Sequence, residues 1–214
     1  IALLESRGDL KRVYHPASPH LEITEIARRV LANGGPALLF ETPVRTDGSH
    51  YGYPVLANLF GTRERVALGM GAEPSRLRAI GRQLADLKEP APPDNLAEAL
   101  GKVRLAKNIW DMTPRVFDAP PCAHTVLTGG DIDLARLPIQ HAWPDDIAPL
   151  ITWGLVITQS ARLPRQNVAI YRQQPVGKNR VIMRWLAHRG GARTDPIHPH
   201  PRADGPARRR APQP

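Results

Sequence analysis

The stretch from Gln166 to Gly191 constrains the fold of this chain more than any other. It reads QNVAIYRQQPVGKNRVIMRWLAHRGG. Its apolar alternation predicts two β runs joined by a short polar turn at Gly177 to Asn179. Five polar residues that a plain hairpin does not need lie among the apolar positions: Asn167, Arg172, Arg184, His188 and Arg189. A site that holds a phosphate and a metal ion needs such residues, so the stretch predicts one.

The three arginines of this stretch carry rigid forks of donors that suit phosphate oxygens. Arg184 and His188 share parity on the second run, so their side chains are expected on the same face. Strict alternation puts Asn167 and Arg172 on opposite faces. Either a bulge intervenes, or one of the two reaches the site from a strand end.

The metal half of the prediction depends on Asn167 and His188. An amide oxygen and an imidazole nitrogen form a mixed pair that suits Mn²⁺ or a similar divalent ion. Two ligands do not complete a site, and no carboxylate lies between them in the sequence. From residue types alone, a surface Asn and a packed His is the favoured interpretation.

The first half of the chain predicts a strand–helix–strand–strand unit after a short helix at residues 1–7. The helix of this unit is expected to begin with Ser18 as its cap and Pro19 at its first position, and to close at Gly34. Apolar runs predict buried strands, and 3–4 residue spacing predicts further helices. The strands are expected at 10–14, 36–40 and 54–60, and the further helices at 63–70, 77–87 and 94–110.

The second half is expected to be mostly β. Residues 111–149 are rich in Pro, Gly and Asp with one β run at 123–128, and the apolar run at 149–158 predicts a central strand. The segment GGDIDL at 129–134 fails the calcium-loop spacing and predicts a turn. The expected fold class is therefore α+β, with a small α/β domain at 1–110 and an incomplete, mostly β domain at 111–191.

Residues 192–214 differ in character from everything before them. This tail is rich in Pro and Arg, and its one aliphatic side chain larger than Ala is Ile197. It is expected to be disordered, because it cannot bury enough surface to offset its ordering entropy. A wrong-frame read-through or a truncated gene model explains this composition. The alternative is that His198, His200 and the run from Arg208 to Arg210 bind a metal or a polyanion.

Charge and cysteine content limit the classes of partner. The net charge is +9, of which the tail contributes +3, and the remaining excess suits an anionic small molecule or membrane headgroups. No basic helix or RNA-binding aromatic pattern accompanies the charge, so no nucleic-acid partner is expected. The single cysteine, Cys122, allows neither an intramolecular disulfide nor a cysteine-based zinc site. With no signal peptide and no long apolar span, cytoplasmic residence is expected.

Seven segments carry a resemblance to a known family: HLEITEIARRVLANGGPALLFE (20–41), PVLANLFGT (54–62), ALGMG (67–71), LKEPAPP (87–93), PLITWGL (149–155), QNVAIYRQQPVGKN (166–179) and IMRWLAHRGG (182–191). In their order and spacing, they resemble the N-terminal part of UbiD-type decarboxylases. The resemblance covers residues 1–191. It implies that the second domain is part of a split barrel that binds flavin.

The resemblance also implies a reaction and its cofactors. Family members carry out reversible, non-oxidative decarboxylation with prenylated FMN, while Mn²⁺ and often K⁺ bridge the cofactor phosphate. The implied substrate is an aromatic carboxylic acid, with 4-hydroxy-3-polyprenylbenzoate of ubiquinone biosynthesis as the nearest choice. A homo-oligomer, when the protein is intact, and peripheral association with the inner face of the cell membrane are further expectations.

Roles for individual residues follow from the same resemblance. Asn167 and His188 would be metal ligands. Arg172 would also belong to an acid–Arg–acid network, in which it orients the carboxylic acid that protonates the carbon from which CO₂ leaves. The residues expected to line the cofactor are Ile170, Tyr171, Arg172, Arg184, Trp185, Leu186, Arg189 and Gly190.

The sequence departs from the family after residue 191. There the family has its metal-binding glutamate and both acids of the network, whereas this chain has only Asp195 and Asp204. The chain as written is therefore expected not to decarboxylate alone. The alternative is a non-catalytic remnant or binding module that keeps a flavin-phosphate pocket.

Overall fold

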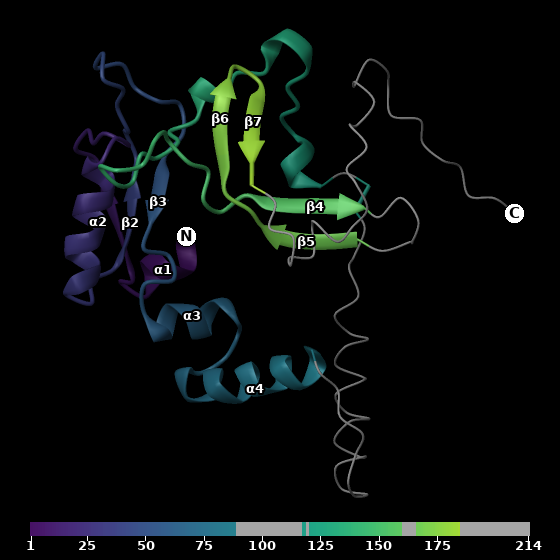
Figure 1. Cartoon of the computed structure of the whole chain (residues 1–214). Coiled ribbons are helices and arrows are strands. Elements are labelled where there is room, and N and C mark those ends of the chain that lie inside the picture. The colour runs from purple at the N-terminus through teal and green to yellow at the C-terminus, as the bar shows by residue number, and fades with distance from the viewer. Residues whose placement is uncertain (89–116, 119, 160–165, 185–214) are drawn as a thin grey trace, which may run out of the picture. The chain divides into compact units, whose positions relative to one another are not determined.

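The computed structural model describes residues 1–88, 117–118, 120–159 and 166–184 (Figure 1). The chain divides into two compact units, which are treated separately below. The first unit consists of Ile1–Ser18 and Glu22–Ile132, and the second of Pro19–Leu21 and Asp133–Pro214.

The first unit is built on a three-stranded sheet of β1 (Leu10–Val13), β2 (Ala37–Phe40) and β3 (Val55–Ala57), in that spatial order. β1 and β2 are parallel, with Leu10 opposite Ala37, and β3 runs antiparallel to β2. A parallel pair needs a crossover connection, which α2 (Glu22–Ala32) supplies. The predicted strand–helix–strand–strand order is confirmed.

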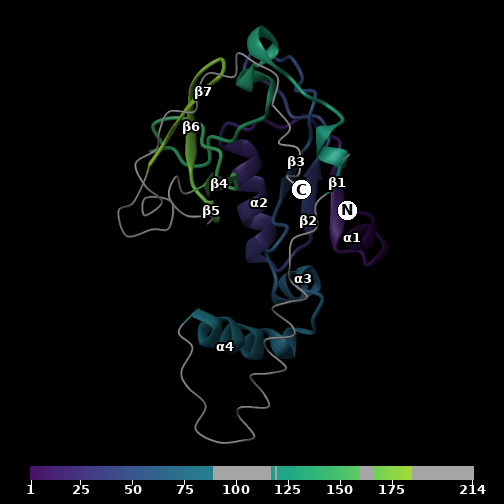
Figure 2. The same ribbon diagram turned by 90° about the vertical axis from the view of Figure 1, so that its right-hand side faces the viewer.

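The core of this unit lies on both faces of β2, whose four residues are all buried. Alternate side chains of a strand point to opposite faces. Leu38 and Phe40 accordingly pack with Ile23 and Ala27 of α2. Figure 2 shows α2 beside the sheet that contains β2. Ala37 and Leu39 pack with Leu4 of α1 (Ala2–Ser6), and Leu68 of α3 (Arg63–Gly69) lies against the same cluster. β2 is therefore the central strand of a helix–sheet–helix arrangement.

The predicted start of α2 at Ser18 is wrong, since the helix begins at Glu22. Leu21 has a φ of 66°, in the left-handed region that a helix cannot include. Its N–H donates to the His141 carbonyl oxygen at 2.9 Å, and the His141 N–H donates to the Pro19 carbonyl oxygen at 3.1 Å. Residues 19–21 therefore pair with a distant segment instead of starting the helix.

Two of the three helices predicted after β3, those at 63–70 and 77–87, are confirmed. α3 begins after Thr62, whose hydroxyl accepts a hydrogen bond from the Arg65 N–H at 3.3 Å. A 3₁₀ turn, η1 (Pro74–Arg76), leads into α4 (Leu77–Lys88). The helix predicted at 94–110 lies outside the described residues. Within the described part of the chain, no helix has the length and apolar character to cross a membrane.

The second unit contains two antiparallel pairs: β4 (Leu155–Gln159) with β5 (Gln166–Ile170), and β6 (Gln173–Gly177) with β7 (Arg180–Met183). A 3₁₀ turn, η4 (Leu134–Arg136), precedes them. In the described residues these pairs form small sheets and no closed barrel. Helices and strands are therefore mixed along the chain, and the α+β fold class is confirmed.

Three predictions about the β part need correction. Residues 123–128 form no strand, because the Pro120–Pro121 pair leads into a 3₁₀ turn, η2 (Pro121–Ala123), with irregular chain after it. The run at 149–158 is a strand only from Leu155 onward. The first run of the predicted hairpin is divided, because β5 pairs with β4 while β6 pairs with β7. The prediction of a turn at 129–134 is confirmed by the 3₁₀ turn η3 (Gly129–Asp131) and the start of η4.

Candidate functional site

The site predicted from the sequence begins where the chain passes from β5 to β6. Only Tyr171 and Arg172 lie between these strands. Tyr171 is 8% exposed, the one large apolar side chain that is buried in the described part of the second unit, whereas Arg172 is exposed. The Tyr171 N–H donates to the Gly154 carbonyl oxygen at 3.4 Å. Because successive side chains of an extended chain point in opposite directions, burial of Tyr171 turns Arg172 outward.

The structure places Arg172 and Arg184 at the open end of the β6–β7 hairpin. Gln173 and Met183 are the last paired residues at this end. The next position of the same register sets Arg172 opposite Arg184, and both side chains are exposed. Two like charges directly opposite each other destabilise a sheet. An anion between them removes the repulsion, and their guanidinium forks match the oxygens of a phosphate.

Asn167 lies on β5, opposite Thr158 of β4, and is half-buried. Its amide nitrogen is buried and has no hydrogen-bond partner. An unsatisfied buried donor costs about 1–3 kcal/mol, which a ligand oxygen would recover. The feature therefore fits a ligand acceptor, such as a phosphate or carbonyl oxygen. It gives no direct support to a metal ion, which would take the amide oxygen.

The pairing shows an extra residue on the partner strand and none between Asn167 and Arg172. Leu155 pairs with Ile170, and Ile151 forms an isolated bridge with Gln173. Three residues lie between Ile151 and Leu155, whereas only two lie between Ile170 and Gln173. The extra residue falls within 152–154, so Asn167 and Arg172 keep their opposite faces. The register of the β6–β7 hairpin, continued by one position, sets Arg172 opposite Arg184, whereas Asn167 lies on the other face of its strand.

One face of the β4–β5 pair carries exposed aliphatic side chains. Leu155 lies opposite Ile170, and Ile157 opposite Val168. The exposed fraction of Ile170, a predicted cofactor contact, is 49%. Arg172 continues the parity of Val168 and Ile170, so an apolar surface leads to the arginine pair.

Half of the predicted site lies outside the described residues, namely Trp185, Leu186, His188, Arg189 and Gly190. In the described ranges, no group of three His, Cys, Asp or Glu side chains could hold a metal ion. Of the two predicted metal ligands, only Asn167 can be placed. The predicted shared face of Arg184 and His188 stays a prediction.

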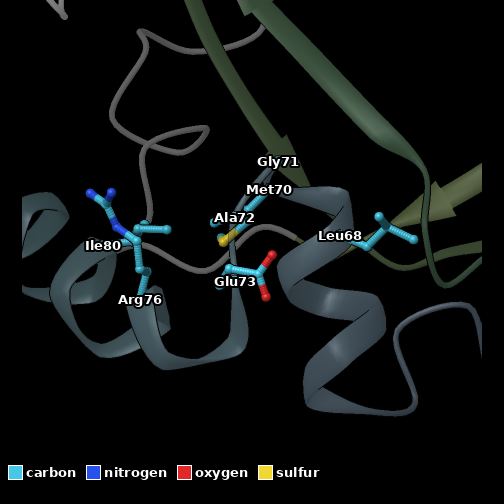
Figure 3. Close-up of a pocket in the computed structure, with 7 residues that line it drawn as sticks. All are labelled: Leu68, Met70, Gly71, Ala72, Glu73, Arg76 and Ile80. Atoms are coloured by element: carbon cyan, nitrogen blue, oxygen red, sulfur yellow. The ribbon is translucent and has the colours of Figure 1, made fainter.

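A hollow that sequence reasoning missed lies in the first unit, between α3 and α4 (Figure 3). Its lining combines apolar side chains with one acid and one arginine: Leu68, Met70, Gly71, Ala72, Glu73, Arg76 and Ile80. The only sequence signal is Gly71, which has a φ of 63° in the turn after α3. No cluster of chemically reactive side chains lines this hollow.

Two family models match the chain. Residues 1–84 match the N-terminal domain of 3-octaprenyl-4-hydroxybenzoate carboxy-lyase, and residues 115–198 match the Rift-related domain of the same enzyme. Together the two matches include β1 to β7 and every predicted site residue.

Solved structures agree with these matches. The UbiD-class enzyme HmfF from Pelotomaculum thermopropionicum, in complex with FMN, is 27% identical with a TM-score of 0.64, over 86% of this chain and 35% of that one. An evolved dimeric form of HmfF, in complex with prFMN, is 26% identical with the same TM-score, over 86% of this chain and 37% of that one. The apo 3,4-dihydroxybenzoic acid decarboxylase of Klebsiella pneumoniae shares the fold. It is 22% identical with a TM-score of 0.64, over 88% of this chain and 36% of that one.

This chain spans about a third of the length of those enzymes. The two matched domains lie in the order that the sequence segments predict, and the solved relatives share the fold over most of the chain. On this evidence the chain belongs to the UbiD family of carboxy-lyases.

Proposed function

We propose that this chain supplies one wall of a flavin site for the non-oxidative decarboxylation of an aromatic acid. The observation that carries the proposal is the cross-strand position of Arg172 and Arg184, two exposed like charges at the open end of one hairpin. A phosphate monoester matches both guanidinium forks. The FMN bound to HmfF carries such a group and supports this choice of ligand.

The described residues fit the flavin half of the proposal. Arg172 and Arg184 would hold the phosphate of prenylated FMN. Ile170 would offer apolar surface beside the ring, and buried Tyr171 would fix the backbone on which Arg172 stands. In this proposal Trp185, Leu186, Arg189 and Gly190, which lie outside the described residues, would also contact the cofactor.

The metal half of the proposal has less support. Asn167 and His188 would ligate Mn²⁺, and K⁺ would accompany it, but the face of the strand on which Asn167 lies is opposite to that of Arg172. The donor set needs at least one carboxylate, and among the described residues no His, Cys, Asp or Glu side chains gather into a group that could hold a metal ion. We therefore propose that this chain by itself binds flavin phosphate without completing the metal site.

The same consideration applies to catalysis. Prenylated FMN, when bound, supplies the electron-accepting chemistry of decarboxylation. The part of this chain would be to orient a carboxylic acid through Arg172, so that the acid can protonate the carbon that has lost CO₂. After Gly191 the chain offers only Asp195 and Asp204 as acids. The second candidate function, a binding module without catalysis, describes what these 214 residues would do alone.

Titration of the purified chain with FMN tests the first part of the proposal. Saturable quenching of flavin fluorescence, which inorganic phosphate reverses in competition, is the expected result. The absence of saturable binding would remove the flavin proposal. Turnover of 4-hydroxy-3-polyprenylbenzoate or 3,4-dihydroxybenzoate by the chain with prenylated FMN and Mn²⁺ would show that it needs no further acid. Association with a membrane surface or with further copies of the chain is tested separately, by vesicle sedimentation and by light scattering.

A further inference from the structure

The β-bulge at residues 152–154 lies directly opposite Tyr171 and Arg172. On its N-terminal side Ile151 bridges to Gln173, and on its C-terminal side Leu155 pairs with Ile170. The family resemblance assigns no role to this bulge. β-Bulges bend a strand and redirect the side chains beside them, and they are frequent next to active sites.

Gln173 joins the two strand pairs of the second unit. Its N–H donates to the Ile151 carbonyl oxygen at 3.1 Å, and its carbonyl oxygen accepts from the Ile151 N–H at 2.8 Å. On its other side it pairs with Met183 in the β6–β7 register. Both backbone polar groups of Gln173 point toward Ile151. Gln173 and Met183 therefore form a pair without hydrogen bonds between their two backbones. The backbone is therefore fixed from both sides at the residue that follows Arg172.

The amide end of the Gln173 side chain lies close to Gly154, so a side chain at 154 would crowd it. A Cβ atom added at Gly154 would lie 3.1 Å from Gln173 Nε2 and 3.5 Å from Ile151 Cγ2. Gly154 is next to both neighbours of Arg172 in the sequence. Its carbonyl oxygen accepts a hydrogen bond from Tyr171, and the side chain of Gln173 occupies the space beside its Cα atom.

We propose that Gly154 is a positioning residue for Arg172: the glycine leaves the Gln173 side chain its place beside the bulge, and the undisturbed backbone of Gln173 then sets the direction in which Arg172 projects. The inference rests on the proposed function, because the direction of Arg172 matters for binding only if the arginine pair holds an anion. Functional side chains must be held within about 0.5 Å of their productive geometry. A Cβ atom at 154 would press on the amide end of the Gln173 side chain, which can turn away, whereas the branched side chain of valine needs more room beside Gln173 and Ile151. The strain that valine adds would fall on Gln173, the residue that follows Arg172.

The test compares FMN binding by the full 214-residue chain in four variants. Gly154→Val is expected to raise the dissociation constant of FMN at least about tenfold, since a misplacement near 1 Å at a binding group can cost up to about a hundredfold. Gln173→Ala removes the side chain that valine would displace, so the double variant should regain part of the lost affinity. Gly52→Val is the matched control, because a Cβ at Gly52 meets no atom within 4 Å. If Gly154→Val does not fold, the dissociation constant of FMN is measured for Gly154→Ala and compared with the same control.

A purely structural role would lower the urea midpoint of unfolding and FMN affinity together, with no recovery in the double variant, and that result would overturn the proposal. Unchanged FMN affinity in Gly154→Val would overturn it as well. If the wild-type chain itself does not bind FMN, the proposed function fails. The positioning inference is then judged by the NMR signal of the Arg172 side-chain Nε–H. Gly154→Val should shift this signal and Gly52→Val should not, and equal spectra for both variants would refute the inference.

Discussion

Arg172 and Arg184 lie opposite each other one position beyond the Gln173–Met183 pair, at the open end of the β6–β7 hairpin. The strands bring together two cations that repel each other when no ligand is present. Sheet stability alone does not favour this arrangement, whereas binding of a doubly charged phosphate does. The relationship therefore connects the local register of one hairpin to the proposed flavin site.

Replacing either arginine should weaken FMN binding. For Arg172→Gln and Arg184→Gln we expect the dissociation constant to rise about 10- to 100-fold, because a hydrogen bond to a charged group contributes about 1.5–3 kcal/mol. Isothermal titration at low salt measures the change. Arg180→Gln is the matched control, since Arg180 is an exposed arginine of the same hairpin at its closed end, opposite Gly177. Equal losses in all three variants would indicate general charge attraction and no defined site.

Asn167 gives a prediction in which stability and binding change in opposite directions. Its buried amide nitrogen has no partner, so Asn167→Leu should stabilise the ligand-free chain by about 1 kcal/mol. The same variant should weaken binding of FMN, or of FMN with Mn²⁺. Urea unfolding and ligand titration of one preparation measure both effects. A variant that is less stable and binds FMN normally would show that Asn167 serves the fold only.

The order of elements in the first unit could be predicted from the sequence because its signals are local. The apolar run at 36–40 is buried on both faces, as an unbroken run of this kind predicts. The start of α2 was not predictable, because the positive φ of Leu21 goes with its bond to His141, far along the chain. No local pattern near Ser18 indicates that pairing.

The division of the predicted hairpin has a similar cause. No Gly or Pro separates Ile170 from Gln173, so the local pattern gives no sign that β5 and β6 have different partners. The change of partner strand between β5 and β6 depends on the long-range pairing of Gln173 with Ile151 and with Met183. The arginine pair could be listed from the sequence as two phosphate ligands, but their opposition across one hairpin follows only from the register.

Phe40 tests the central position of β2 in the first unit. Its side chain is fully buried and packs in the cluster that contains Ile23 and Val55. Phe40→Ala should lower the free energy of unfolding by about 3–5 kcal/mol, through lost burial and the cavity left behind. Phe117→Ala is the control, since that side chain is 67% exposed and should change stability by less than about 0.5 kcal/mol. Chemical denaturation followed by circular dichroism distinguishes the two, and similar losses would contradict the assigned core.

The acid response of α2 should depend on Glu25. Hydrogen bonds from Arg28 and then Arg29 lower the pKa of this carboxyl from its ordinary value of 4.5 to about 2. Because the folded-state pKa is the lower one, the stabilisation is present above pH 4.5 and is lost as the pH falls toward 2. Titration of the Glu25 carboxyl carbon by NMR should give a midpoint near 2. In Arg28→Gln/Arg29→Gln the midpoint should return toward 4.5. All three side chains are exposed to solvent, so 1 M salt should also narrow the difference. A midpoint near 4.5 in the unmodified chain at low salt would show that these ion pairs do not persist in solution.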